Sequence, residues 1–231
     1  MLNISPAEWT AVLLSLKVGL VATLVATPIG IAIAWLLARH HFWGKSLVDA
    51  VIYLPLVLPP VVTGYLLLLT FGRKGLVGGW LADHLGIVFA FRWTGAALAC
   101  GIMSFPLLVR PIRLSIEAVD RRLEQAASTL GAAPSKVFLT VTLPLALPGI
   151  LAGMVLGFAK AIGEFGATIT FVSNIPGETQ TISAAIYTLT QVPDGDMAAL
   201  RLVAVSIVIS LVALVVSEWF TRRATQRLHG I

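Results

Sequence analysis

The sequence has 231 residues, of which 58% are hydrophobic and only 12% are charged, and its formal net charge is +5. Soluble domains carry roughly 25% charged residues, and the charges here cluster, which leaves uncharged runs long enough to cross a bilayer. The composition excludes an ordinary soluble domain and predicts an all-α, polytopic transmembrane helical bundle in one domain, residues 1–231. Lys and Arg flanking the membrane explain the positive charge, so we expect no nucleic-acid partner.

The first predicted helix begins at Ser5-Pro6-Ala7-Glu8, which has the form of a capping box with Pro at the first helical position. An uncharged run, 18–37, follows between Lys17 and Arg39. We predict a helix over residues 6–38, with its span at about 10–38 and a kink at Pro28. The N-terminus lacks a positive region before this run, so we expect an anchor and not a cleaved signal peptide.

Four further spans are predicted, at about 48–71, 93–110, 143–160 and 199–219. The second contains Pro55, Pro59 and Pro60, which bend or break a helix, so it should pack against protein or a cavity. The third contains Pro106. Residues 161–191 are Thr-rich and acidic, and we interpret them as re-entrant or surface structure. After the last span come Trp219, Phe220 and the positive residues Arg222, Arg223 and Arg227.

The distribution of positive residues predicts the orientation of these five spans. One side holds residues 39–45, 110–136 and the C-terminal tail, with ten Lys or Arg. The other side holds the N-terminus and residues 72–93 and 161–201, and its cluster of Arg73, Lys74 and Arg92 is smaller. Positive loops favour the cytoplasm. We therefore predict a periplasmic N-terminus, a cytoplasmic C-terminus and a cytoplasmic loop at about 111–142.

The cytoplasmic loop contains two short helices by pattern. Asp120 can cap the first, which has one apolar stripe and ends before Gly131. Pro134 can open the second. The stripe of the first helix is Leu123, Ala126, Ala127 and Leu130, and that of the second is Val137, Phe138 and Val141. Periodicity alone leaves two readings open, an amphipathic loop on the lipid headgroups or a docking surface for another protein.

The spacing within this loop resembles a known family pattern. Gln125-Ala126-Ala127, three residues, Gly131, nine residues and then Val141-Thr142-Leu143-Pro144 is similar to the EAA loop of type I ABC importer permeases. That loop reads Glu-Ala-Ala, three residues, Gly, nine residues, then Ile, any residue, Leu-Pro. Here Gln125 stands in place of the Glu, with Glu124 one position earlier, and Val141 replaces Ile. The resemblance implies the type I ABC importer permease fold.

The resemblance also implies a coupling role. In that family the loop holds a coupling helix that sits in a groove of a separate ATPase subunit and passes the movement of the ATPases to the transmembrane helices. Small side chains in the loop allow the close approach of another surface. The coupling residues implied are Glu124, Gln125, Ala126, Ala127, Gly131, Pro134, Leu143 and Pro144.

Other stretches resemble the molybdate permeases within that family. They are LPLVLPPVVTGY at 54–65, Ser104-Phe105-Pro106, and GEFGATITFVSNIPGET at 163–179. The resemblance implies a homodimer in the bacterial inner membrane, with two cytoplasmic ATPase subunits and a periplasmic molybdate-binding protein. Sulfate and tungstate permeases are close relatives of that group, so these cargoes stay open as alternatives.

Residues of the 161–191 segment are the candidates for the translocation pathway or gate. An acid at membrane depth, Glu164, is a functional candidate, but it would repel a dianion. We expect it to join a polar network that shapes or closes the outer gate, with simple exposure at the interface as the alternative. Hydroxyl groups are better hosts for an oxyanion. The candidate pathway residues are Glu164, Phe165, Thr168, Thr170 and Ser173.

Other motifs do not support a different chemistry. Gly44-Lys45-Ser46 lacks the earlier Gly of a phosphate-binding loop, because Arg39 stands there. His40 and His41 are adjacent and cannot both face one metal, and Cys100 lies alone in an apolar run. We see no nucleophile–base arrangement and expect no catalytic residue, no metal site and no cofactor. The alternatives are an ion-gradient-driven secondary transporter, which calls for paired ionisable groups in mid-span, and a membrane enzyme, which calls for clustered His or carboxylates.

Overall fold

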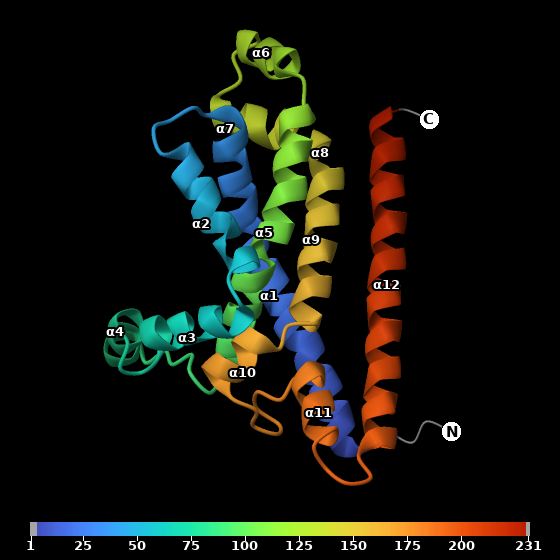
Figure 1. Ribbon diagram of the computed structural model, residues 1–231. Coiled ribbons are helices and arrows are strands. Elements are labelled where there is room, and N and C mark those ends of the chain that lie inside the picture. Colours follow the sequence, from blue (N-terminus) through green and yellow to red (C-terminus); the bar gives the residue numbers. More distant parts are fainter. Residues whose placement is uncertain (1–3, 230–231) are drawn as a thin grey trace.

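The structure is a computed structural model and describes residues 4–229. Of the side chains after Val216, it describes only that of Trp219, so the predicted Phe220, Arg222, Arg223 and Arg227 lie outside the described side chains. The described residues are helical and connecting segments, with no strand among them, which confirms the all-α prediction. Helices α1 (Pro6–Arg39), α5 (Trp93–Ala118) and α9 (Leu147–Ile162) form the central bundle, and α12 (Asp196–His229) runs beside α9 (Figure 1).

Helix α1 begins at the predicted capping box. The Ser5 hydroxyl accepts a hydrogen bond from the Glu8 amide (3.2 Å), and a Glu8 carboxylate oxygen accepts one from the Ser5 amide. The other Glu8 oxygen accepts from Arg201 Nη2 of α12 (2.8 Å). The Glu8 side chain is buried, so this ion pair fastens the beginnings of α1 and α12 together. The helix runs through Pro28 without a break.

The predicted second span is divided into two helices. Helix α2 (Lys45–Val57) is followed by Leu58, and α3 (Pro60–Phe71) departs from it at 115°. Leu58 is extended because the residue before a proline is pushed out of the helical region, and Pro59 and Pro60 follow it. Pro55 stays inside α2. Helices α3 and α4 (Leu76–Leu85) project sideways from the bundle (Figure 1).

The third predicted span continues well beyond Arg110. Helix α5 contains both Pro106 and Pro111 and ends only at Ala118. Beyond it come α6 (Arg121–Thr129), α7 (Pro134–Val137), a π-helical turn η1 (Phe138–Thr142) and α8 (Leu143–Leu145). The helical run Pro134–Leu145 meets α9 at a bend of 68°.

Small residues hold α5 and α9 close together. Gly149, Gly153 and Gly157 recur every four residues on the face of α9 that meets α5. A Cβ at Gly153 would lie 2.5 Å from the Leu108 carbonyl oxygen, and one at Gly149 would lie 2.6 Å from that of Pro111. This spacing lets two helix backbones approach without side chains between them, as in many membrane helix pairs.

Residues 161–191 form two short helices, α10 (Gly166–Val172) and α11 (Ile182–Leu189). Within the described residues, α1, α5 and the 196–216 part of α12 are long and apolar enough to cross a membrane. The number rises to five when each bent pair counts as one span. Neither α10 nor α11 is among them. The α6–α7 segment lies at one end of the molecule, and α10 and α11 lie at the other (Figure 1).

Candidate coupling surface and gate

The segment 119–145 lies at one end of the bundle (Figure 1) and overlaps most of the loop predicted at 111–142. Asp120 Oδ1 accepts a hydrogen bond from the Arg122 amide (2.9 Å), which confirms the predicted cap. Gly131 has a φ of +83°, the left-handed conformation predicted to end the first helix. Among the described residues of α6 none is buried, and the stripe residues Leu123 and Leu130 are 50% and 89% exposed. The Leu123 and Leu130 side chains of the apolar stripe therefore leave half or more of their surface open.

Glu124 and Gln125 lie on different sides of α6. Gln125 is exposed, whereas the Glu124 side chain is 19% exposed and forms an ion pair with Arg39 at 2.9 Å. The same Glu124 oxygen accepts a hydrogen bond from the Thr142 hydroxyl (2.6 Å). Arg39 Nη2 also donates to the Val119 carbonyl oxygen (3.1 Å). The acid that sits one position before the family's usual Glu is thus the one that anchors the helix to the bundle.

This polar network joins four parts of the chain. Arg39 ends α1, Val119 directly follows α5, Glu124 belongs to α6, and Thr142 belongs to η1. The Arg39 side chain is only 9% exposed, so its charge is largely withdrawn from water and depends on Glu124. A displacement of α6 must therefore pull on the ends of α1 and α5 or break a mostly buried ion pair.

A cavity of about 530 Å³ lies beneath α6, beside the network. The Trp35 ring forms one wall and makes edge-on contacts with His40 (4.9 Å between centroids) and Phe138 (5.7 Å). The polar residues that line this pocket are Arg39, His40, Arg121, Glu124, Gln125, Ser128, Thr129 and Thr142. Its lining residues come from α1, α6, α7 and η1, so the pocket lies between α6 and the neighbouring end of the bundle.

The remaining predicted coupling residues lie around this surface. Ala126 and Pro134 are exposed and Ala127 is half-buried, so the small-residue face of α6 and the start of α7 are open to another protein. Leu143 packs against the core formed by α1, α2, α5 and α9, whereas Pro144 is exposed. The Leu-Pro pair therefore connects the open surface to the interior of the bundle.

The predicted gate residues lie near the opposite end of the molecule, where α9 gives way to α10. Glu164 is buried, which excludes the alternative of simple exposure at the interface. Its Oε2 accepts from Lys160 Nζ (2.7 Å) and its Oε1 from the Ala167 amide (3.0 Å), so it forms a polar network that fixes the start of α10. The Phe165 ring lies against the exposed Tyr187 of α11, with 5.1 Å between centroids.

Helix α10 packs closely on α3 just after the break in the second span. A Cβ at Gly64 would lie 2.5 Å from the Ala167 carbonyl oxygen, so only Gly fits at this crossing. The buried Thr168 and the half-buried Thr170 both donate their hydroxyl protons to carbonyl oxygens within this segment. Ser173 ends α10 with a φ of +65° and is exposed. The gate candidates thus share one short, tightly held element.

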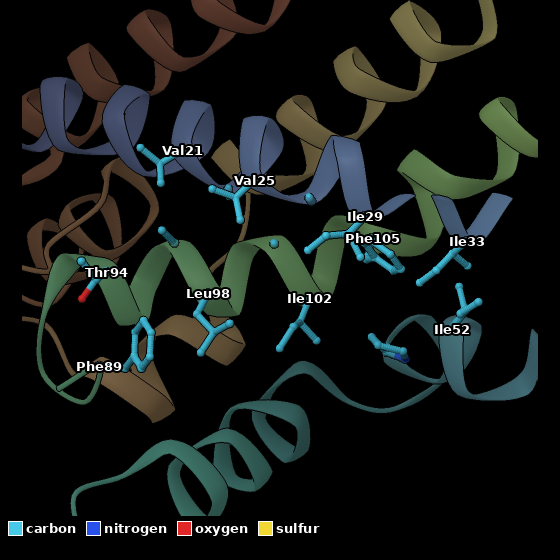
Figure 2. Close-up of a pocket in the computed structure, with 15 residues that line it drawn as sticks. Val21, Val25, Ile29, Ile33, Ile52, Phe89, Thr94, Leu98, Ile102 and Phe105 are labelled. Atoms are coloured by element: carbon cyan, nitrogen blue, oxygen red, sulfur yellow. The ribbon is translucent and has the colours of Figure 1, made fainter. Parts of the chain in front are cut away.

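A second cavity, an open groove of about 470 Å³, runs between α1, α2 and α5 (Figure 2). Val21, Val25 and Ile29 line it from α1, and Leu98 and Ile102 line it from α5. Its side chains are apolar except that of Thr94. An ion that left water for this groove would gain almost no hydrogen bonds in return, so the groove does not suit a charged cargo.

Sequence reasoning missed Arg39, Thr142 and Lys160. The sequence places Arg39 at the charged end of the first predicted span and indicates no partner for it. For Lys160 the sequence held a signal, because residues four apart on a helix face each other, as Lys160 and Glu164 do. No local pattern connects Arg39 to Glu124, which lies 85 positions away. Among the described residues there is no group of three or more His, Cys, Asp or Glu that could hold a metal ion.

Comparison with known proteins decides the family. The sequence model of the binding-protein-dependent transport system inner membrane component matches residues 26–226. The chain belongs to this family. Its members are transport components of the inner membrane and not enzymes.

Individual relatives of this transport family cover nearly the whole chain. A protein of Escherichia coli K12 named molybdenum transport system permease protein ModB is 60% identical over 220 residues, which are 95% of this chain and 96% of that protein. A protein of the same name from Haemophilus influenzae is 54% identical over 221 residues, 96% of each chain. A probable sulfate transport system permease protein of Nephroselmis olivacea is 34% identical over 216 residues, 93% of this chain and 75% of that protein.

Solved structures of more distant transporters share the fold. A bacterial ABC transporter that imports alginate matches with a TM-score of 0.74 at 20% identity, over 95% of this chain and 80% of that one. An amino acid ABC transporter matches with a TM-score of 0.63 at 22% identity, over 94% of each. The fold is therefore that of ABC importer permeases, as the EAA-like spacing implies.

Proposed function

We propose that this chain is the permease subunit of an ATP-driven molybdate importer and that it works as a homodimer. Two cytoplasmic ATPase subunits dock on the 119–145 segments, and a periplasmic molybdate-binding protein docks on the opposite face. The observation that carries the proposal is the 60% identity, over nearly the full length of both chains, to a molybdenum transport permease. The lower identity of 34% to the sulfate relative favours molybdate over sulfate.

The geometry of the cytoplasmic segment supports its proposed coupling role. The outward face of α6 offers small and apolar side chains to a partner, while its inward face is tied to α1 and α5 through Glu124 and Arg39. ATP binding closes the ATPases, draws the two segments together and opens the pathway outward. Hydrolysis returns the pathway to its inward-facing state. The residues proposed to take part are Glu124, Gln125, Ala126, Ala127, Gly131, Pro134, Leu143 and Pro144.

The gate is proposed at α10 and its neighbours. Glu164 and Phe165 start the element, Thr168 and Thr170 lie within it, and Ser173 ends it. Its close crossing with α3 couples it to the bend at Pro59 and Pro60, where a span changes direction. We propose that movement of the bundle shifts α10 against α3 and so opens or closes the outer side.

The cargo is tested by uptake of radiolabelled molybdate into cells that lack their own molybdate permease and express this chain with its ATPase and binding protein. We expect uptake that unlabelled molybdate and tungstate inhibit at similar concentrations and that sulfate inhibits only at far higher ones. Equal inhibition by sulfate would contradict the molybdate assignment and favour a general oxyanion permease.

A further inference from the structure

Two hydroxyl groups at the gate have no proton left for an anion. The Thr168 hydroxyl donates to the Phe165 carbonyl oxygen (2.9 Å), and the Thr170 hydroxyl donates to that of Gly166 (2.9 Å). A hydroxyl has a single proton to donate, so these groups face a cargo only as acceptors. An oxyanion needs donors or positive charge, and these two threonines supply neither.

Lys160 is the positive charge nearest in sequence to the gate. It is the only Lys or Arg between residues 137 and 200. It lies on α9, on the flank between the buried Gly157 and Ala161 and the exposed Leu156 and Ala159. Its side chain is 30% exposed, and its Nζ lies 2.7 Å from Glu164 Oε2. An ammonium has three donors, and Glu164 takes one of them.

Glu164 holds this lysine in a fixed position. The Glu164 side chain is 1% exposed, and its second oxygen accepts from the Ala167 amide. Because both carboxylate oxygens are bonded, Glu164 holds the Lys160 Nζ at the start of α10. It also cancels most of the lysine's charge, so an anion beside Lys160 meets directed N–H donors and little net attraction.

We propose that Lys160 donates hydrogen bonds to the tetrahedral oxyanion as it passes the gate, while remaining paired with Glu164. This inference rests on the proposed function, because it takes the cargo to be an oxyanion and the assembly to hold two such pairs. Charge-assisted hydrogen bonds recognise the anion, and the neutral pair keeps its binding weak. Weak binding suits a pathway, because a site that held the dianion tightly would stop it from leaving.

The test uses the complete importer and a series of variants. Binding is measured by equilibrium dialysis of radiolabelled molybdate against the permease–ATPase complex without nucleotide, and uptake is measured in proteoliposomes that also contain the binding protein. Lys160→Met removes the donors but leaves Glu164 buried without its partner. Lys160→Met combined with Glu164→Gln removes both charges, and Gln keeps an oxygen for the Ala167 amide. Lys160→Arg keeps the charge.

The matched control is Lys17→Met. Lys17 is an exposed lysine of α1 that lies over the Trp93 ring, 3.6 Å from its centroid, and it has no place in the proposed site. We expect the double variant to bind molybdate about 10-fold more weakly or worse, since a hydrogen bond to a charged group is worth at least that factor. Lys160→Arg and Lys17→Met should bind within about 3-fold of wild type.

Glu164→Gln alone should strengthen molybdate binding, whereas the double variant weakens it. With the lysine no longer neutralised, molybdate binds more tightly and uptake slows, while the preference for molybdate over sulfate is unchanged. A double variant that binds like wild type would overturn the Lys160 assignment, as would an equal loss in Lys17→Met. Failure of the wild-type importer to take up molybdate would instead contradict the proposed function, so the two failures are distinct.

Discussion

The guanidinium of Arg39 carries much of the proposed coupling. It is largely buried and bonds both to the end of α5 and to Glu124 of α6. Losing one partner of a buried ion pair leaves the other charge uncompensated, at a cost of about 3 kcal/mol or more. The tie between α6 and the bundle is therefore broken by a change at either residue.

We predict that Arg39→Gln and Glu124→Gln each uncouple the importer. The ATPases still dock on the outward face of α6 and still hydrolyse ATP, but the number of molybdate ions imported per ATP falls by about tenfold. The measurement is uptake and phosphate release on the same proteoliposomes. Arg110→Gln, an exposed arginine of α5, is the control and should leave the ratio unchanged. An Arg39→Gln importer with the wild-type ratio would remove Arg39 from the coupling path.

For single residues, the sequence predicts the interactions and backbone conformations that depend on near neighbours in the chain. Asp120 as a cap and Gly131 as a left-handed stop follow from rules that operate within a few residues. The partnership of Arg39 with Glu124 arises only when α1 and α6 are brought together by the fold, so no sequence window contains it. The burial of Glu164 was likewise decided by how α10 packs on its neighbours.

Helix α6, the proposed coupling helix, depends on Gly131 to turn the chain toward α7. Apart from the glycine and its two chain neighbours, no described residue has an atom within 4 Å of a Cβ built at this position, so a side chain there meets conformational strain and not a clash. A left-handed conformation costs an ordinary L-residue about 1–2 kcal/mol, and more for a β-branched one, whereas Asn adopts it readily.

We predict that Gly131→Val abolishes transport and weakens the association with the ATPase, while membrane insertion is unaffected. Gly131→Asn should retain most of both activities. Co-purification of the ATPase with the tagged permease, followed by uptake, measures the two effects. Wild-type co-purification and uptake by the valine variant would count against a docking role for this turn.

Prolines end one of the helices and are tolerated inside another. Pro59 and Pro60 end α2 as predicted, because two prolines follow an extended residue. Pro106 and Pro111 do not end α5, which continues to Ala118 against the glycine face of α9. Tertiary packing overrides the local rule there. The π-turn at 138–142 and the 68° bend after it have no counterpart in the sequence pattern.

For the whole molecule, the proposed orientation places the 119–145 segment in the cytoplasm and the α11 end in the periplasm. Cys100 is fully buried and can be replaced by Ala to give a background without cysteine. Ser135 of α7 and Gln191 after α11 are both exposed and serve as sites for single cysteines.

We predict that a membrane-impermeant maleimide labels Gln191→Cys in intact spheroplasts. The same reagent should label Ser135→Cys only after the membrane is permeabilised. Labelling is measured as the mass shift of the purified chain. The reverse pattern would invert the topology and would move the coupling segment away from the ATPases.

Composition alone was enough to predict a helical membrane protein, because the chain has too few charges for a soluble domain and its uncharged runs are long enough to cross a bilayer. The motif spacing added the family, which the comparisons bear out. The path of the cargo could not be predicted in the same way, because a pathway forms only where several elements, and in the proposed homodimer two chains, come together. Lys160 illustrates this, since its proposed role depends on Glu164 and on the start of α10.

We propose that this chain couples ATP hydrolysis on one side of the membrane to oxyanion import from the other. The most direct test is molybdate uptake by proteoliposomes that hold the purified permease, with the ATPase, the binding protein and ATP supplied or withheld one at a time. We predict uptake only when all of them are present. Uptake that proceeds without the ATPase or without ATP, driven by an ion gradient alone, would contradict the claim and identify a secondary transporter.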